Sequence, residues 1–220
     1  GVRTVWMGHP VVDQLEGMRI DGAREGDLIG LFAGSREREV GRLFPMMLEA
    51  VGRLRQVDAS WRYETAAASE ALAATMRRMV VEAGLSGDEV VIGTGTSQAL
   101  MQRATAGVVA SGTATLEATY YGLPYCLVYG VAWPTYVLGR ILVDIEHVGL
   151  ANILAQREVV HEFMQGEANA GNVASFLEFM MTEPERREEL RKELLGVADL
   201  LGGGGAAERA AAAIVELLNQ

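Results

Sequence analysis

The chain has 220 residues, half of them hydrophobic, and carries a formal net charge of −10 at pH 7. Its length fits one large domain, or one domain with appended helices, and allows a substantial core. No stretch approaches the roughly 20 apolar residues of a membrane span, and the acidic charge argues against general nucleic-acid binding, which needs a basic surface. The single cysteine, Cys126, excludes an internal disulfide, and with no signal-peptide pattern we expect a reducing, cytoplasmic setting.

The amino-terminal segment predicts a strand, a turn and a second strand. Residues 3–7 look like a strand that begins almost at the first residue of the chain. We therefore expect the second half of a longer protein or a shortened form of one. A sharp turn follows at Gly8-His9-Pro10, where His9 is better explained as a structural residue than as a ligand. After a polar connection, the apolar run 27–33 predicts a buried strand.

The central part of the chain repeats a unit of strand, small-residue turn and helix. The turn Gly34-Ser35-Arg36 precedes an amphipathic helix expected over about 39–56. Further strands are expected over 61–67, 89–92, 107–110 and 125–129, with helices over 69–83, 97–103, 114–122 and 134–143.

The carboxyl-terminal part is predicted to be mainly helical. Residues 144–158 look irregular, and Asn152 lies there among apolar neighbours, so it either braces the backbone or contacts a ligand. Helices are expected over about 171–182, 184–201 and 206–218, with four glycines before the last one. We therefore divide the chain into a nucleotide-binding domain, 1–169, and carboxyl-terminal helices, 170–220, that pack on a missing domain or a second subunit.

Strands alternating with helices predict an α/β fold, a Rossmann-like and largely parallel sheet with flanking helices. Ligands of such sheets bind beyond the carboxyl ends of the strands, at the point where the strand order reverses. The turns 34–36, 93–97 and 111–113 all follow predicted strands, so we expect all three at that edge of the sheet.

The turn Ser111-Gly112-Thr113 is the most informative of these. Between a strand and a helix, it would aim free backbone N–H groups at one point, which suits a phosphate. Glu117 lies one helical turn after Thr113 on the same face, where its carboxylate could accept hydrogen bonds from a ribose. The alternative is a plain turn, with Thr113 as N-cap and Glu117 solvated. Arg36 has the same two interpretations, a phosphate ligand or a solvated charge.

Four sequence blocks together resemble the lipid-A-disaccharide synthase family. These are GHP with Asp13, GSR with Glu39, ASGTATLE from Ala110 to Glu117, and LANILA from Leu150 to Ala155. The resemblance covers nearly the whole chain and implies the carboxyl-terminal, nucleotide-sugar-binding half of a GT-B glycosyltransferase. The implied reaction transfers 2,3-diacylglucosamine from UDP to 2,3-diacylglucosamine 1-phosphate. It is implied to be inverting and metal-independent, without a cofactor, at the inner face of the cytoplasmic membrane.

The resemblance also implies roles for individual residues. Arg36 and Asn152 would hold the diphosphate and stabilise the leaving group, Ser35, Gly112 and Thr113 would contact the donor UDP, Glu117 would bind the ribose, and Gly95 and Thr96 would line the uracil pocket. The family pattern usually has proline where Ala33 and Ala151 stand and a carboxylate where Thr105 stands. The acceptor site and general base would belong to the missing amino-terminal domain.

Other functions remain open at this point. The chain could be half of another GT-B enzyme acting on a UDP-sugar, a murein-type glycosyltransferase or an epimerase, although the GSR and LANILA blocks argue against both. It could instead be a non-catalytic nucleotide-binding fragment. A homodimer is possible on either view.

Overall fold

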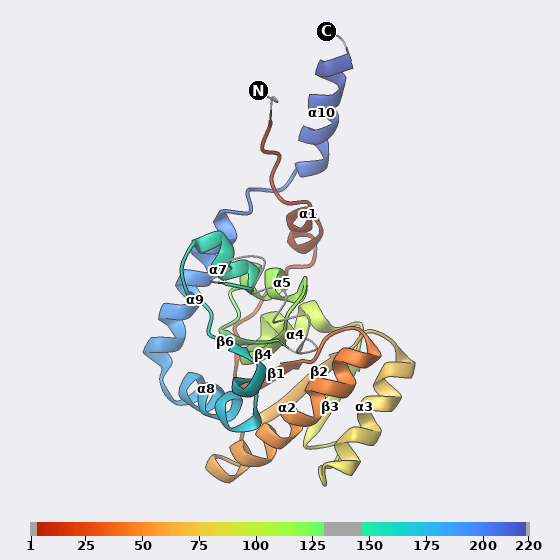
Figure 1. Ribbon diagram of the computed structural model, residues 1–220, viewed down its shortest axis with the longest axis vertical. Helices are drawn as coiled ribbons and strands as arrows, with labels where there is room; N and C mark the ends of the chain where they lie inside the picture. Colours follow the sequence, from red (N-terminus) through yellow and green to blue (C-terminus); the bar gives the residue numbers. More distant parts are fainter. Residues whose placement is uncertain (1–3, 130–146, 219–220) are drawn as a thin grey trace.

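The computed structural model describes residues 4–129 and 147–218, in which six parallel strands form one sheet in the order β3-β2-β1-β4-β5-β6 (Figure 1). This arrangement confirms the predicted Rossmann-like sheet, because the chain runs outward from β1 to β3 and then crosses to the other side of β1 for β4. The strands are β1 (Glu25–Phe32), β2 (Arg62–Ala67), β3 (Val90–Thr94), β4 (Ala104–Ala110), β5 (Tyr125–Tyr129) and β6 (Glu162–Met164).

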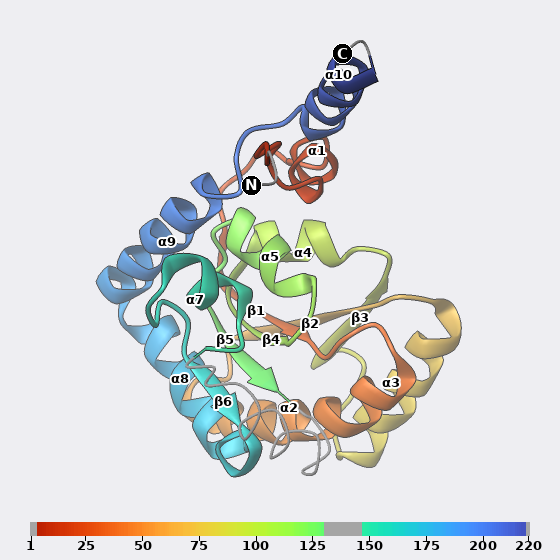
Figure 2. The same ribbon diagram turned by 45° about the horizontal axis from the view of Figure 1, so that its top comes forward.

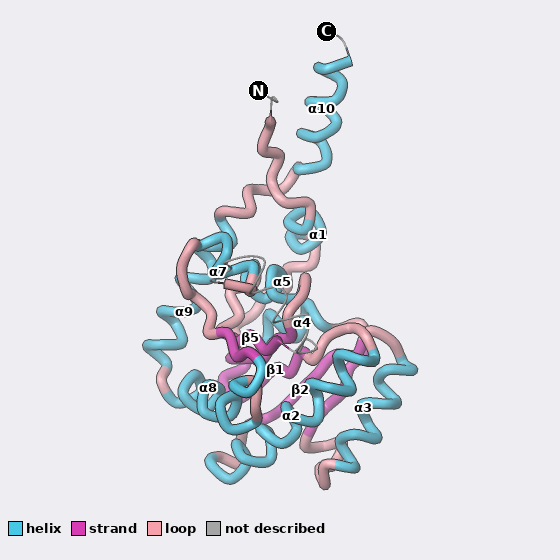
Figure 3. The backbone as a smooth tube through the Cα atoms, viewed as in Figure 1, coloured by secondary structure: helices cyan, strands magenta, loops and turns pink. Residues whose placement is uncertain are grey.

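Helices cover both faces of the sheet, as the tube in Figure 3 and the turned view in Figure 2 show. One face packs on α2, α3 and α8, and the other on α4, α5, α7 and α9. The described helices are α1 (Val11–Glu16), α2 (Glu37–Val57), α3 (Glu70–Glu82), α4 (Ser97–Arg103), α5 (Ala114–Tyr120), α7 (Leu150–Ala155), α8 (Ala170–Thr182), α9 (Pro184–Asp199) and α10 (Ala206–Leu218), with a 3-10 turn at Gln165–Glu167.

Alternation along the central strand β1 explains why both faces are covered. Ile29 and Leu31 are buried against the α2 side, whereas Leu28 and Phe32 are buried against the α5 side. Successive side chains of a strand point to opposite faces, so a strand that is apolar at every position must be covered on both. No described helix is long and apolar enough to cross a membrane.

Two local predictions were wrong. Residues 5–7 form no strand, and Val5 and Trp6 are exposed because nothing in the described chain pairs with them. The segment 11–13, for which no element was predicted, begins helix α1. The stretch 144–158 contains the helix α7, and the edge strand β6 was missed because three residues carry too short a pattern. The helix predicted over 134–143 lies outside the described residues.

The predicted boundary at residue 170 does not separate two packing units. Val173 and Leu177 of α8 and Leu194 and Val197 of α9 are all buried in the two cores of the sheet. Helices α8 and α9 therefore belong to this domain, since their apolar faces are already covered. Among the described helices, α10 extends farthest from the sheet (Figure 1).

Helix α10 is attached instead to the amino-terminal segment. The Asp13 carboxylate accepts hydrogen bonds from the backbone N–H of Gly205 and Ala206, which caps α10 from a distant part of the chain. Arg209 donates two hydrogen bonds to the carbonyl of Met7, at 3.0 and 2.8 Å. His9 has the expected structural role, because its Nδ1 accepts a hydrogen bond from the N–H of Val11.

Candidate functional site

The three predicted turns meet around one hollow of about 510 Å³ at the carboxyl ends of β1–β4. We name it the carboxyl-edge hollow. The strand order reverses between β1 and β4, so the hollow lies at the position where sheets of this class bind ligands. It is lined by Phe32, Gly34, Ser35, Arg36, Glu39, Ala66, Ala67, Ala68, Gly95, Ser97, Gln98, Ala110, Ser111, Gly112, Thr113, Ala114 and Glu117.

The turn after β4 presents backbone donors to the hollow. Gly112 has φ +151°, a conformation that side-chain-bearing residues rarely adopt, and this allows the chain to pass directly from strand to helix. Thr113 occupies the N-cap position of α5, but its side chain makes no capping hydrogen bond. The N–H groups of Thr115 and Leu116 donate to the carbonyls of Gly112 and Thr113, so among the described residues of this turn the donors left for an acceptor in the hollow are the N–H groups of Gly112, Thr113 and Ala114.

Arg36 stands at the opposite wall of the hollow, at the start of α2. Its Nη1 lies 2.8 Å from Oε1 of Glu39, and the arginine side chain is 80% exposed. Glu39 folds back over Gly34, where an added Cβ would lie 2.5 Å from the carboxylate. Gly34 therefore makes room for Glu39 beside the strand end, and the carboxylate holds Arg36 next to the hollow.

Glu117 projects from α5 into the same space. Its carboxylate is half-buried, and this burial raises its pKa, with a smaller opposing effect from the hydrogen bond of Gln98. The Gln98 amide donates to Oε2 of Glu117 at 3.2 Å. A buried carboxylate with one acceptor oxygen held and the other facing a hollow is suited to receive hydroxyl groups.

The third turn contributes backbone and not side chains. Gly95 lines the hollow with φ +67°. The Thr96 side chain folds over Gly93, where an added Cβ would collide with its hydroxyl. Thr96 does not line the hollow in the described part of the chain, so of the expected pair only Gly95 forms its wall.

A comparison of the sequence with protein families identifies one family. A model of lipid-A-disaccharide synthetases matches residues 1–211. The chain belongs to the lipid-A-disaccharide synthase family. A lipid-A-disaccharide synthase from Syntrophus aciditrophicus is 34% identical over 210 residues, covering 92% of this chain and 54% of that protein. The synthase from Geobacter metallireducens is 33% identical over 230 residues, covering 100% and 59%. The chain thus spans a little over half the length of these relatives.

Solved structures show the same fold at much lower identity. A Staphylococcus aureus MnaA–UDP structure superposes with a TM-score of 0.65 at 16% identity, covering 97% of this chain and 54% of that one. The pneumococcal O-GlcNAc transferase GtfA, in complex with UDP and GlcNAc, gives 0.57 at 13% identity, covering 90% and 37%. At these identities the likeness extends to the fold alone, and it confirms the expected half of a GT-B fold.

One residue singled out by the family pattern does not reach the hollow. Asn152 is fully buried, and its amide nitrogen donates to the Val160 carbonyl and to Glu162, both at 2.7 Å. Its oxygen accepts from the N–H groups of Val159 and Val160, both at 2.8 Å. These four bonds use the full capacity of an asparagine side chain. The backbone-bracing alternative therefore describes Asn152, and a direct contact with a diphosphate would require these bonds to break.

Two lining side chains of this synthase-family chain were not predicted as ligands. Glu39 was noted only as part of the GSR block, and Gln98 was not singled out. Gln98 lies one residue into α4, after a turn that ends a strand, and that position was the only signal for it.

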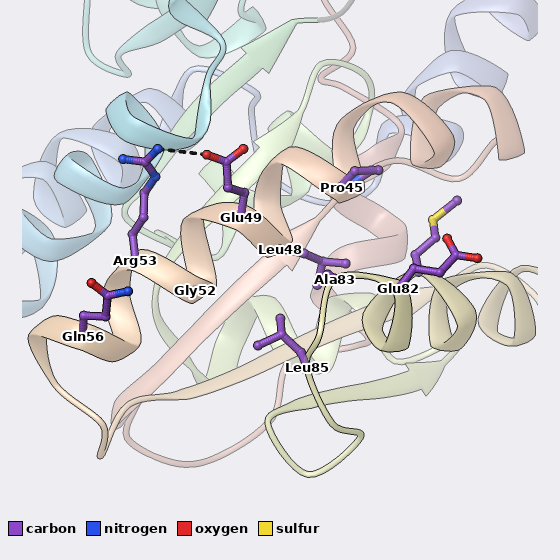
Figure 4. A pocket seen from close by; sticks show the side chains of 10 residues that line it. Pro45, Leu48, Glu49, Gly52, Arg53, Gln56, Glu82, Ala83 and Leu85 are labelled. Atoms are coloured by element: carbon purple, nitrogen blue, oxygen red, sulfur yellow. Dashed lines mark hydrogen bonds and ion pairs between the residues drawn. The ribbon is translucent and has the colours of Figure 1, made fainter.

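A larger hollow in the described chain lies elsewhere and carries less chemistry. It has about 760 Å³ and separates the carboxyl-terminal halves of α2 and α3, away from the strand ends that form the site. Figure 4 shows Arg53 turned toward Glu49, with which it forms an exposed ion pair at 2.9 Å. Among the described residues that line it, this exposed pair is the one contact between polar side chains, and the hollow lies away from the strand ends, so its size alone does not make it a site.

Proposed function

We propose that this chain is the donor-binding half of a lipid-A-disaccharide synthase and that it binds UDP-2,3-diacylglucosamine in the carboxyl-edge hollow. One observation carries the proposal. In a chain of this family, a guanidinium, an uncapped helix start and a half-buried carboxylate surround one space at the switch point. These are the three groups that a nucleoside diphosphate needs, for its charge and for its ribose.

The proposed roles follow from chemistry. Arg36, Ser35 and the N–H groups at Gly112 and Thr113 contact the diphosphate, and Glu117, held by Gln98, accepts the ribose hydroxyls. Gly95 forms the wall for uracil, and Thr96 supports that wall by packing on Gly93. Negative charge grows on the departing UDP, so donors aimed at the diphosphate stabilise the transition state more than the ground state. This makes a metal ion and a cofactor unnecessary in the proposed reaction, which would invert the anomeric centre.

The rest of the reaction belongs to the part of the enzyme outside this chain. We propose that the amino-terminal half supplies the acceptor site for 2,3-diacylglucosamine 1-phosphate and the general base. The enzyme would work at the inner face of the cytoplasmic membrane, where both lipid substrates reside, either alone or as a homodimer. Asn152 then acts indirectly, by fixing the segment between α7 and β6.

Calorimetric titration of the purified chain tests this proposal. UDP and UDP-2,3-diacylglucosamine should bind, CDP and ADP should bind more weakly, and the chain alone should form no disaccharide. Addition of the amino-terminal half should restore disaccharide formation without added metal and in the presence of EDTA. Equal affinity for UDP, CDP and ADP would contradict the donor assignment. UDP binding without activity in the two-half enzyme would favour a non-catalytic nucleotide-binding module.

A further inference from the structure

A second hollow lies at the amino ends of the strands, on the side of the sheet opposite the carboxyl-edge hollow, and its lining differs in chemistry from that of the donor site. It has about 540 Å³ and is formed by the segment before β1, the carboxyl ends of α4 and α5 and the first turns of α9. Four arginines line it: Arg19, Arg24, Arg187 and Arg191. We name it the basic hollow. Among the described residues that line it, Glu188 is the one acidic side chain.

Arg24 shows how the basic hollow is built. Its guanidinium is half-buried and donates to the carbonyls of Met101, Ala104 and Tyr121 at 2.7, 2.5 and 2.6 Å. These carbonyls end α4 and α5, whose partial negative charges favour a cation there. No carboxylate contacts Arg24 in the described chain, and burial, followed by the charge of Arg191, lowers its pKa to about 10. The nearby Glu188 carboxylate has a smaller opposing effect on that pKa, and the group stays charged at neutral pH.

The other three arginines add positive charge to the basic hollow, and Glu188 is the one carboxylate among its described lining residues that can offset it. Arg187 donates to the carbonyls of Met180 and Met181, and Arg19 lies 4.8 Å from the ring centre of Tyr120. Arg191 alone has an ionic partner, Glu188, at 3.1 Å. Capping of helix ends explains Arg24 and Arg187 individually. It does not explain why four guanidinium groups share one hollow with one carboxylate, in a protein whose net charge is −10.

We propose that the basic hollow binds the phosphate group of a small ligand or of a lipid, independently of the donor site. Guanidinium groups offer planar, paired donors that match phosphate oxygens. A dianionic phosphate would add negative charge beside four guanidinium groups that share, among the described lining residues, the one carboxylate of Glu188. The hollow lies at the amino ends of the strands, whereas the donor hollow lies at their carboxyl ends, so both can be occupied at once.

Titration of the full chain with inorganic phosphate, in chloride buffer and with saturating UDP, tests the proposal. Phosphate should bind at one site that UDP does not displace. Arg191→Gln and Arg19→Gln should each weaken it by about tenfold, the loss of one charge-assisted contact. Arg186→Gln is the matched control, because Arg186 lies on the same helix and forms the same i,i+3 pair, with Glu189, but does not line the hollow. Glu188→Gln should tighten phosphate binding.

Vesicles distinguish the two sources of the phosphate. Phosphatidylcholine vesicles with phosphatidic acid should bind the chain through the same arginines if a lipid headgroup is the ligand, and inorganic phosphate should then compete. Saturable phosphate binding without vesicle binding assigns a soluble ligand. The proposal fails if neither probe binds, if UDP displaces the phosphate, or if Arg186→Gln weakens binding as much as Arg191→Gln does. Circular dichroism of each variant separates loss of binding from loss of fold.

Discussion

Replacing Arg36 by alanine should weaken UDP and leave uridine nearly unchanged, because uridine has no phosphate for the guanidinium to contact. A hydrogen bond to a charged group is worth about 1.5–3 kcal/mol. Arg36 must first give up its pair with Glu39, and since its side chain is 80% exposed, that pair is worth at most about 1 kcal/mol. If the full value of that pair is lost, about 1 kcal/mol, the expected net loss is about 0.5–2 kcal/mol, or roughly 2- to 30-fold in the dissociation constant of UDP.

Calorimetry with both ligands checks the expectation on three variants. Glu117→Ala should weaken UDP and uridine by similar factors, because both ligands carry the ribose. Arg38→Ala is the matched control, since Arg38 is exposed on the same first turn of α2 but does not line the hollow. Unchanged UDP affinity in Arg36→Ala, with the fold intact by circular dichroism, would refute the diphosphate assignment. Equal losses of UDP and uridine in that variant would refute it as well.

Two further substitutions probe this site, and a third probes the attachment of α10. Glu39→Gln frees Arg36 and removes a negative charge, so UDP should bind a few-fold more tightly in the same titration. Because burial raises the pKa of Glu117, ionisation of this carboxyl lowers the free energy of unfolding. Glu117→Gln removes that ionisation and should therefore raise Tm at neutral pH. The gain in Tm should shrink as the pH falls through the pKa of Glu117, because the wild-type carboxyl is then protonated. In the wild type, uridine affinity should also fall on acidification, starting above the usual carboxyl range. Asp13→Ala removes the cap of α10, worth about 0.5–2 kcal/mol, and hydrogen exchange should speed up in the first turn of that helix while the sheet stays protected.

The sheet and its functional edge were predictable because each rests on a repeated, local signal. The run 27–33 is apolar at every position after Asp27, which indicates a strand covered on both faces, and the structure places Glu25–Phe32 at the centre of the sheet. Parallel strands place the turns that follow them on one edge, so three small-residue turns sufficed to locate the hollow. The strand β6 has three residues and the helix α7 has six. These segments are too short for the hydrophobic repeat of a strand to be distinguished from that of a helix.

Partnerships between distant residues could not be predicted in the same way. The GHP block with Asp13 looked like a turn, yet Asp13 caps a helix 192 residues away in sequence. Helix α9 looked separable because its sequence is strongly charged, yet its narrow apolar face, like that of α8, completes a core of the sheet. Charge along a helix reports its exposed face and says little about what covers the other one.

For Asn152, the role implied by the family pattern differs from the role that the structure shows. The pattern ties this position to the reaction, whereas the structure fills all four of its hydrogen-bonding positions with protein groups. Both statements hold if Asn152 acts by fixing Glu162, which also accepts from the N–H groups of Val148 and Gly149 at 2.9 Å. Asn152→Ala would leave several buried groups without partners, at about 1–3 kcal/mol each. The first effect of Asn152→Ala should thus be a lower midpoint of urea unfolding, and the UDP affinity of the folded variant should stay near wild type. A variant that is as stable as the wild type but no longer binds UDP would show instead that Asn152 contacts the ligand.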